Sequence, residues 1–174
     1  MGTLAIAIVS YLTILWIVLG GYHIYSLLFS TPFYPSRVKH LKEAFQKLGL
    51  EVTKSTNFVD LGSGDGRVVV WAARMGMKST GIELNPFLTF FTKIKIFIYR
   101  LKNAKIKNKS FYKENFGEYD IVYMYIYNTH MDKLKDKLFE EMKNGSIILT
   151  NTFKFKNIEP DKSYKRFHIY KIKK

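Results

Sequence analysis

Apolar and polar positions divide the chain into two unlike parts. From Leu4 to Gly21 no side chain carries a formal charge, and the first charged side chain is that of Arg37. After Arg37, short apolar runs alternate with segments whose apolar residues recur every three or four positions. The first pattern predicts one long apolar helix within residues 1–29. The second predicts an α/β domain over residues 30–174.

The N-terminal run is long enough to cross a bilayer, which needs about 20 apolar residues. It is apolar on every face, unlike the amphipathic core helix of a soluble domain. No basic residue precedes it, which disfavours a cleaved signal peptide. Arg37, Lys39, His40 and Lys42 follow it. We therefore expect a single-pass membrane anchor with the C-terminal domain facing the cytoplasm.

The second part opens with a helix expected at 36–48, capped by Ser36 and ended by Gly49. Strand and helix patterns then alternate. Strands are expected at 57–62, 79–85, 109–115, 119–127, 146–155 and 164–172, and helices at 66–76, 86–103 and 130–145. This alternation is typical of a doubly wound, Rossmann-like parallel sheet with helices on both faces.

Composition narrows the chemistry. There is no cysteine, which excludes disulfides, thiolate metal sites and cysteine nucleophiles, and the four histidines are too dispersed for a metal site. The net charge of +14 indicates either an acidic partner or a lysine-rich solvated surface. A nucleic acid partner is not expected, because 174 residues leave no room for a dedicated RNA-binding appendage.

Directly after the first expected strand the sequence reads "DLGSGDGR", with glycines at alternate positions: Gly62, Gly64 and Gly66. A dinucleotide-binding loop, G-x-G-x-x-G, would need a glycine where Arg67 stands. A phosphate loop would end in Gly-Lys-Ser/Thr, which is absent. Asp60 and Asp65 would also repel a phosphate. They suit a ligand with a positive end.

S-adenosylmethionine (SAM) is such a ligand, because it carries a sulfonium and an α-ammonium and no phosphate. Glu83 ends the second expected strand, about 20 residues after Asp60, where an acidic residue can bind ribose hydroxyls. The alternative interpretation is an ordinary tight turn with surface acids. The loop, the acid at this spacing and the strand context together favour SAM.

These residues resemble a known family. "VDLGSGDGR" and "GIELNP" look like motifs of class I, seven-β-strand SAM-dependent methyltransferases. "TPFYPS" ahead of them, with "GIELNPFL" and "FYKENF", is similar to one lineage of protein-lysine methyltransferases. That lineage includes mitochondrial enzymes acting on the ATP synthase c-subunit and the ADP/ATP translocase, and archaeal enzymes of broad lysine specificity.

The resemblance implies SAM as cofactor and assigns contacts by position. The loop residues Asp60, Gly62, Ser63, Gly64, Asp65 and Gly66 would surround its methionine part. Glu83 would bind the ribose, and Leu84 would lie against the adenine. Asn115, beside Phe116, would contact the adenine, with Glu114 as a competitor. A lid over the cofactor would be formed by Thr31, Phe33 and Pro35.

Two departures from the family are visible. "YIYNTH" replaces the usual motif after the fourth strand, and the short C-terminal part is expected to reduce the usual β-hairpin to one strand. Tyr125, Tyr127, Asn128 and Thr129 are expected to end the fourth strand beside the cofactor. Asn128 could accept a hydrogen bond from an amine, and tyrosines can cradle a cation.

Tyr127 and Asn128 are therefore the catalytic candidates. A packing role is their alternative, and it is the expected role for Tyr123 and Tyr125. The sequence thus predicts a membrane-anchored, SAM-dependent methyltransferase acting on lysine in a protein at or near the membrane. The alternatives are a methyltransferase of the same fold acting on a lipid or lipophilic small molecule, and a non-catalytic SAM-binding membrane protein.

Overall fold

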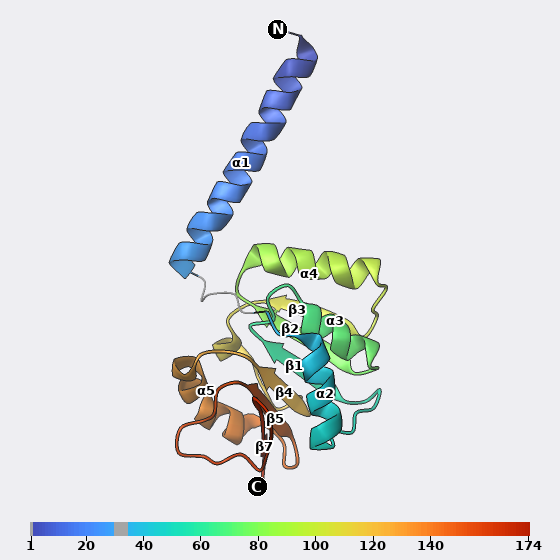
Figure 1. Ribbon diagram of the computed structural model, residues 1–174, viewed down its shortest axis with the longest axis vertical. Coiled ribbons are helices and arrows are strands. Elements are labelled where there is room, and N and C mark those ends of the chain that lie inside the picture. The colour runs from blue at the N-terminus through green and yellow to red at the C-terminus, as the bar shows by residue number, and fades with distance from the viewer. Residues whose placement is uncertain (1, 30–34) are drawn as a thin grey trace. The chain divides into compact units, whose positions relative to one another are not determined.

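The computed structural model describes residues 2–29 and 35–174, and the chain divides into two compact units, Met1–Tyr34 and Pro35–Lys174 (Figure 1). The described part of the first unit is a single helix, α1 (Thr3–Phe29). The stretch Thr3–Gly21 has a mean hydropathy of 2.3, and none of its residues whose burial the structure describes is buried. By length and composition alone, α1 is a candidate membrane span.

The second unit is built on a seven-stranded sheet in the order β3-β2-β1-β4-β5-β7-β6. Its strands are β1 (Asn57–Leu61), β2 (Lys78–Glu83), β3 (Ala104–Asn108), β4 (Ile121–Met124), β5 (Ile147–Asn151), β6 (Lys162–Tyr164) and β7 (Phe167–Lys171). The first five strands are parallel, and β7 is antiparallel to both of its neighbours. The sheet is therefore mixed, and its parallel part is the Rossmann-like arrangement that the sequence predicts.

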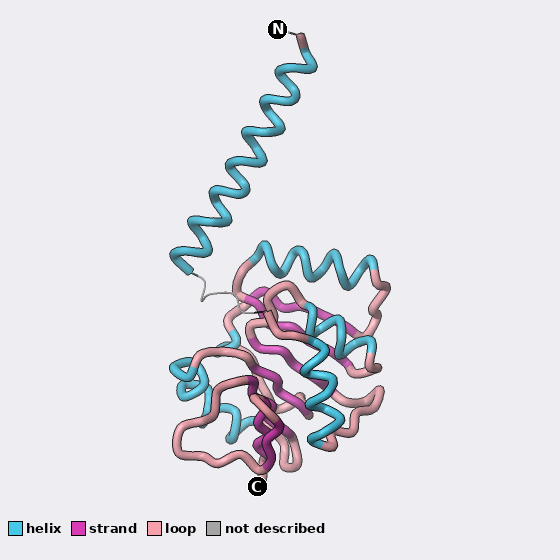
Figure 2. The backbone as a smooth tube through the Cα atoms, in the orientation of Figure 1, coloured by secondary structure: helices cyan, strands magenta, loops and turns pink. Residues whose placement is uncertain are grey.

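Helices cover both faces of this sheet: α2 (Val38–Leu48), α3 (Arg67–Arg74), α4 (Pro86–Ile98) and α5 (Asn128–Glu141) (Figures 1 and 2). Successive side chains of a strand point to opposite faces. Accordingly, Phe58 of β1 packs with α2 and α3, whereas Val59 and Leu61 pack in the other cluster with α5. Two apolar cores, one on each face of the sheet, thus hold the neighbouring strands β2, β1 and β4 so that their carboxyl ends lie side by side.

The third strand was predicted in the wrong place. It lies at Ala104–Asn108, and the expected segment 109–115 instead contains a 3-10 turn, η1 (Phe111–Lys113). Lysines alternate with apolar residues along β3, so its pattern is that of a half-buried strand. The expected loss of the C-terminal hairpin was also wrong, because β6 and β7 pair there.

Two helix starts differ from the predictions. Arg37 occupies the N-cap position of α2, and no side chain caps that helix. Ser36 instead shares a hydrogen bond with the Tyr123 hydroxyl, at 2.8 Å. Gly49 ends α2 with a φ of 68°, which confirms that prediction. The fourth strand stops at Met124, earlier than expected, so Tyr125–Thr129 do not end it.

Candidate functional site

The glycine loop joins β1 to α3 in the left-handed backbone region. Gly62, Gly64 and Gly66 have φ values of 70°, 56° and 74°. Residues with a Cβ rarely adopt such angles, so glycine at all three positions lets the chain turn sharply between strand and helix. The loop backbone also bonds to the neighbouring strand, because Gly62 N–H and Ser63 N–H both donate to the Ile82 carbonyl.

Glu83 fastens this loop from β2. Its Oε2 accepts a hydrogen bond from Gly64 N–H and its Oε1 from Asn85 N–H, each at 2.8 Å. Asn85 in turn caps α4, since its Oδ1 accepts from the backbone N–H groups of Phe87 and Leu88. Glu83 therefore positions the loop and the start of α4, a role that its place in the sequence did not reveal. Further lone pairs of its oxygens remain for a ligand.

The inner face of α4 holds the other side of the loop. Thr92 Oγ1 donates to the Gly64 carbonyl at 3.3 Å, and Lys95 Nζ donates to the Asp65 carbonyl at 2.7 Å. A Cβ on Gly66 would lie 2.3 Å from Thr92 Cγ2, so only glycine fits under this helix. Neither Thr92 nor Lys95 was singled out from the sequence, because nothing in the local pattern joins them to a loop so far away.

Asp65 is already neutralised. Its carboxylate accepts hydrogen bonds from Arg67 Nε and Lys95 Nζ, both at 2.9 Å. Burial raises the pKa of Asp65, but the hydrogen bonds from Arg67 and Lys95 outweigh that effect and leave the pKa below its usual value. Asp65 therefore contributes to the shape of the loop and has little charge left over for a ligand.

Asp60, unlike Asp65, is not neutralised by a basic side chain among the described residues. It is only 4% exposed, and among the residues that the structure describes its carboxylate has neither a hydrogen bond nor an ion pair. Burial, then the negative charges of Glu83 and Asp65, raise its pKa well above the usual value. A positive group placed here would relieve that cost.

Asp60 and Glu83 thus form an acidic pair with no cationic partner in the described part of a chain whose net charge is +14. In such a lysine-rich protein, this arrangement excludes a phosphate and fits the positive end of a ligand. The residues present therefore fit SAM, as predicted from the sequence.

The two polar residues expected near the adenine, Glu114 and Asn115, differ in burial and in their partners within the protein. Glu114 is 3% exposed, and its carboxylate lies 2.6 Å from both Lys107 Nζ and Lys109 Nζ. The side chain of Asn115 is exposed, and its Oδ1 accepts from Gly117 N–H at 2.8 Å. Of the two competitors, Glu114 is committed to the lysines, so Asn115 is the better candidate for the adenine.

The two apolar residues expected at the cofactor differ in exposure. Leu84 follows Glu83 and is 54% exposed. Phe116 is fully buried in the core beside α5, and its contribution to a ligand site is limited to backbone placement. Thr31 and Phe33 of the expected lid lie outside the described residues, and Pro35 is exposed.

An aromatic group lies on the other side of the loop. Ile126 Cγ2 would be 3.6 Å from a Cβ on Gly62, which places the segment after β4 beside the loop. The ring of Phe153 is near those of both Tyr125 and Tyr127, with centroid distances of 6.4 and 5.9 Å. Tyr127 is 37% exposed and precedes α5 as its N-cap.

Asn128 occupies the first turn of α5 and is exposed. Phe153 was not among the residues predicted from the sequence. Its carbonyl accepts from Thr150 Oγ1 at 2.7 Å, which holds the turn after β5 in place. Tyr125, Tyr127 and Phe153, here called the aromatic wall, lie together at the carboxyl ends of β4 and β5.

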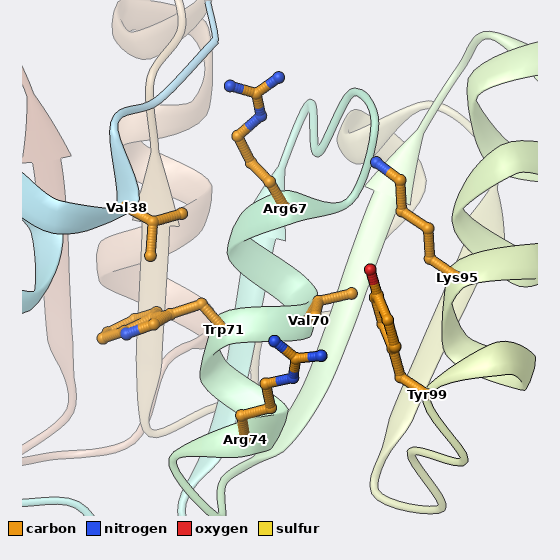
Figure 3. Close-up of a pocket in the computed structure, with 7 residues that line it drawn as sticks. All are labelled: Val38, Arg67, Val70, Trp71, Arg74, Lys95 and Tyr99. Atoms are coloured by element: carbon orange, nitrogen blue, oxygen red, sulfur yellow. The ribbon is translucent and has the colours of Figure 1, made fainter.

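A hollow of about 270 Å³ lies apart from these groups, between α2, α3 and α4 (Figure 3). It is lined by Val38, Arg67, Val70, Trp71, Arg74, Lys95 and Tyr99. The Arg74 guanidinium lies 4.3 Å from the centre of the Tyr99 ring. Among the described residues no acidic side chain lines the hollow, and its lining includes neither Asp60 nor Glu83. It shares with the glycine loop only Arg67 and Lys95, which bond to Asp65.

Comparison with solved structures supports the fold. The chain resembles an RNA methyltransferase from Salinibacter ruber, solved with S-adenosyl-L-homocysteine, with a TM-score of 0.75 and 23% sequence identity. The match covers 80% of this chain and 94% of that one. At this identity the likeness establishes the Rossmann-like methyltransferase fold and nothing about the acceptor.

Curated relatives are closer in sequence. A Homo sapiens protein named as the lysine N-methyltransferase of the ATP synthase c-subunit is 29% identical over 131 residues, which are 75% of this chain and 55% of that protein. A protein-lysine N-methyltransferase of Saccharolobus islandicus (strain REY15A) is 30% identical over 118 residues, covering 63% of this chain and 70% of the relative.

The chain therefore spans little more than half the length of the first of these relatives. A profile of the ANTKMT methyltransferase domain matches residues 60–162, which run from the unpaired aspartate of β1 to the start of β6. The match contains Glu83 and the aromatic wall. The chain belongs to the ANTKMT methyltransferase domain family.

Proposed function

We propose that this protein binds SAM at the glycine loop and transfers its methyl group to the side-chain amine of a protein lysine. The observation that carries the proposal is the pair of buried carboxylates, Asp60 and Glu83, which has no cationic partner among the described residues. Family membership supplies the reaction class. The names of the human and archaeal relatives, both lysine N-methyltransferases, supply the acceptor class.

Each half of the site has its own task. Asp60 receives the positive end of the cofactor, and the free lone pairs of Glu83 receive ribose hydroxyls. Leu84 and Asn115 take the adenine. SAM supplies a methyl group that its sulfonium has already activated. The protein consequently has to orient an amine against that methyl, which is mainly a proximity effect.

The acceptor amine must be neutral to attack. Tyr125, Tyr127 and Phe153 provide an apolar surface, and desolvation there lowers the pKa of a lysine amine. The lysine ammonium would first give one proton to water. The neutral nitrogen would then form a bond to the methyl carbon as the carbon–sulfur bond of SAM breaks, so that the positive charge moves from sulfur to nitrogen. The rings then face a cationic methylammonium product, which aromatic surfaces attract. Asn128, one residue beyond Tyr127, can accept a hydrogen bond from the amine.

A second part of the proposal concerns where the protein acts in the cell. We infer that α1 crosses the membrane once and that residues 35–174 face the cytoplasm. The support is the uncharged stretch Thr3–Gly21, with its mean hydropathy of 2.3, and the basic residues that begin at Arg37. In that setting the substrate lysine belongs to a protein at or near the bilayer.

The test is methyl transfer by the full chain. Host membranes are incubated with the protein and SAM labelled in the methyl group, and the protein fraction is hydrolysed and separated into amino acids. Label in methyl-lysine, strongly reduced with Asp60→Asn at the same SAM concentration, is the expected result. Label only in extracted lipid would replace the protein acceptor with a lipid one, which the apolar outer surface of α4 makes the second candidate. SAM binding without any labelled acceptor would indicate a non-catalytic protein.

A further inference from the structure

Helix α4 is built with its polar side chains inward. The only side chains of this helix that are buried are those of Thr89 and Thr92, and Thr92 bonds to the glycine loop. The large apolar side chains point outward instead. Their exposed fractions are high: Phe90 60%, Phe91 54%, Ile94 38%, Phe97 83% and Ile98 63%.

These five residues, here called the α4 face, recur at three- and four-residue intervals and so share one side of the helix. A surface helix of a soluble domain normally turns such a stripe toward the core. Contiguous exposed apolar surface of this kind marks a contact with a partner or a membrane. Within residues 35–174, nothing packs over it enough to bury it.

The charges beside the α4 face indicate what the partner is. At 3.6 residues per turn, Lys93 falls on one flank of this face, and Lys95, whose ammonium is paired with Asp65, falls on the other. Residues 84–113, which contain the helix, include eight Lys or Arg and no Asp or Glu. The next acidic residue is Glu114. An apolar helix face between basic flanks is the pattern of a helix that lies in the interface of an anionic bilayer.

The hollow beside α4 adds a second basic feature. Figure 3 shows Lys95 and Tyr99 extending from α4 toward α3, with Arg74 on the facing helix. Lys95 and Arg67 are held by Asp65, whereas no carboxylate pairs with Arg74 among the residues that the structure describes. A space of about 270 Å³ with this lining suits a phosphate or carboxylate of a lipid headgroup.

We propose that the α4 face inserts into the interface of an anionic phospholipid bilayer, as a second membrane contact besides α1. A bilayer is preferred over a second copy of this chain, because a copy would bring its own +14 charge to a basic surface. The uncharged stretch Thr3–Gly21 of α1, in which no residue of described burial is buried, also calls for lipid in the same chain. The proposal does not depend on methyl transfer.

Because the chain has no cysteine, one introduced cysteine gives a single labelling site. Full-length Phe97→Cys, carrying an environment-sensitive dye, is reconstituted into vesicles of phosphatidylcholine and phosphatidylserine that contain brominated lipid. Glu159→Cys, at a side chain 92% exposed on another part of the domain, is the matched control. Ile8→Cys reports α1 separately. Thermal unfolding compared with wild type establishes that each variant is folded.

The expected result is strong quenching by brominated lipid at position 97 and none at position 159. Quenching at 97 is expected to fall several-fold in vesicles of phosphatidylcholine alone, and in Lys93→Glu combined with Lys102→Glu. A label at 97 that iodide in the water quenches as fully as the label at 159 overturns the proposal, even where the label at position 8 is in lipid. A label at 97 protected from both quenchers means that protein covers the α4 face, which also overturns it.

Discussion

The glycine loop and the aromatic wall both lie at the carboxyl ends of the parallel strands, but they are held in different ways. The loop is fixed by hydrogen bonds from β2 and α4, and three of its residues have backbone angles that favour glycine. The aromatic wall is held by ring packing, and Tyr127 and Asn128 have exposed side chains with no side-chain hydrogen bond among the described residues.

This difference indicates a division of labour. A cofactor common to many methyltransferases requires one fixed geometry, so its half of the site is rigid. An acceptor differs from enzyme to enzyme, so its half is a surface that can change without disturbing the core. Variants in the loop should therefore alter folding and cofactor binding, and variants in the wall should alter transfer alone.

The largest effect is expected from Gly66→Ala. The new methyl group would meet Thr92 at 2.3 Å in a backbone conformation with a φ of 74°. Strain of about 1–2 kcal/mol and overpacking of about 1–3 kcal/mol should both lower the free energy of unfolding. Gly49→Ala is the matched control, because its φ is 68° but the space around it is open. Equal losses in chemical denaturation would show that α4 does not constrain the loop.

A loss of comparable size is expected for Glu83→Ala. Two buried N–H groups, those of Gly64 and Asn85, lose their acceptor, at about 1–3 kcal/mol each. SAM affinity should fall with stability. Glu83→Gln keeps one acceptor oxygen, so its stability and SAM affinity should lie between those of wild type and Glu83→Ala. If Glu83→Ala loses affinity without stability, Glu83 does not fasten the loop.

Asp60→Asn should separate stability from binding. Because the folded pKa of Asp60 is raised, ionisation disfavours the folded protein, and wild type loses stability as the pH rises from the ordinary aspartate range through that raised pKa. The asparagine variant lacks this loss, so without ligand it should melt at a higher temperature than wild type near neutral pH. Thermal melts across the pH range measure the difference, and a lower melting temperature for the variant would contradict the assignment.

The smallest effect on the fold is expected from Tyr127→Ala. The residue is 37% exposed, and among the described rings its own ring pairs only with that of Phe153, in a tilted arrangement, so stability and SAM affinity should stay close to wild type. Label transfer should fall several-fold, because the acceptor loses part of its apolar surface. Tyr164→Ala on β6, the strand at the edge of the sheet, is the control. A wall that only packs would leave transfer unchanged in both variants.

The sequence was informative where chemistry is local. Asp60 and Glu83 lie on the adjacent strands β1 and β2, and the three glycines follow β1, so the strand–loop–helix pattern was enough to predict that these residues come together. Their contacts with the cofactor stay a prediction. Thr92, Lys95 and Phe153 were not, because they reach the site only through the packing of α4 and the turn after β5. No local pattern records such contacts.

The errors in the fold have a similar origin. Lysine-rich β3 lies at the sheet edge, where only one side of the strand needs apolar residues, so its signal was weak. Segment 109–115 contains Phe111 and Tyr112 and resembles a strand more closely. It instead forms a turn that places Glu114 beside Lys107 of β3 and Lys109. Local propensity gave way to tertiary contacts at both places.

The most direct test of cofactor binding by Asp60 is a calorimetric titration of SAM into wild type and Asp60→Asn without added metal. We expect SAM to bind wild type, and the variant to bind about tenfold to a hundredfold more weakly, from the loss of a charge-assisted contact of about 1.5–3 kcal/mol. Wild-type affinity should also fall as the pH drops through the raised pKa of Asp60, and this dependence should vanish in the variant. Equal affinities in the two proteins, or tighter binding of NAD than of SAM by wild type, would contradict the assignment of this site.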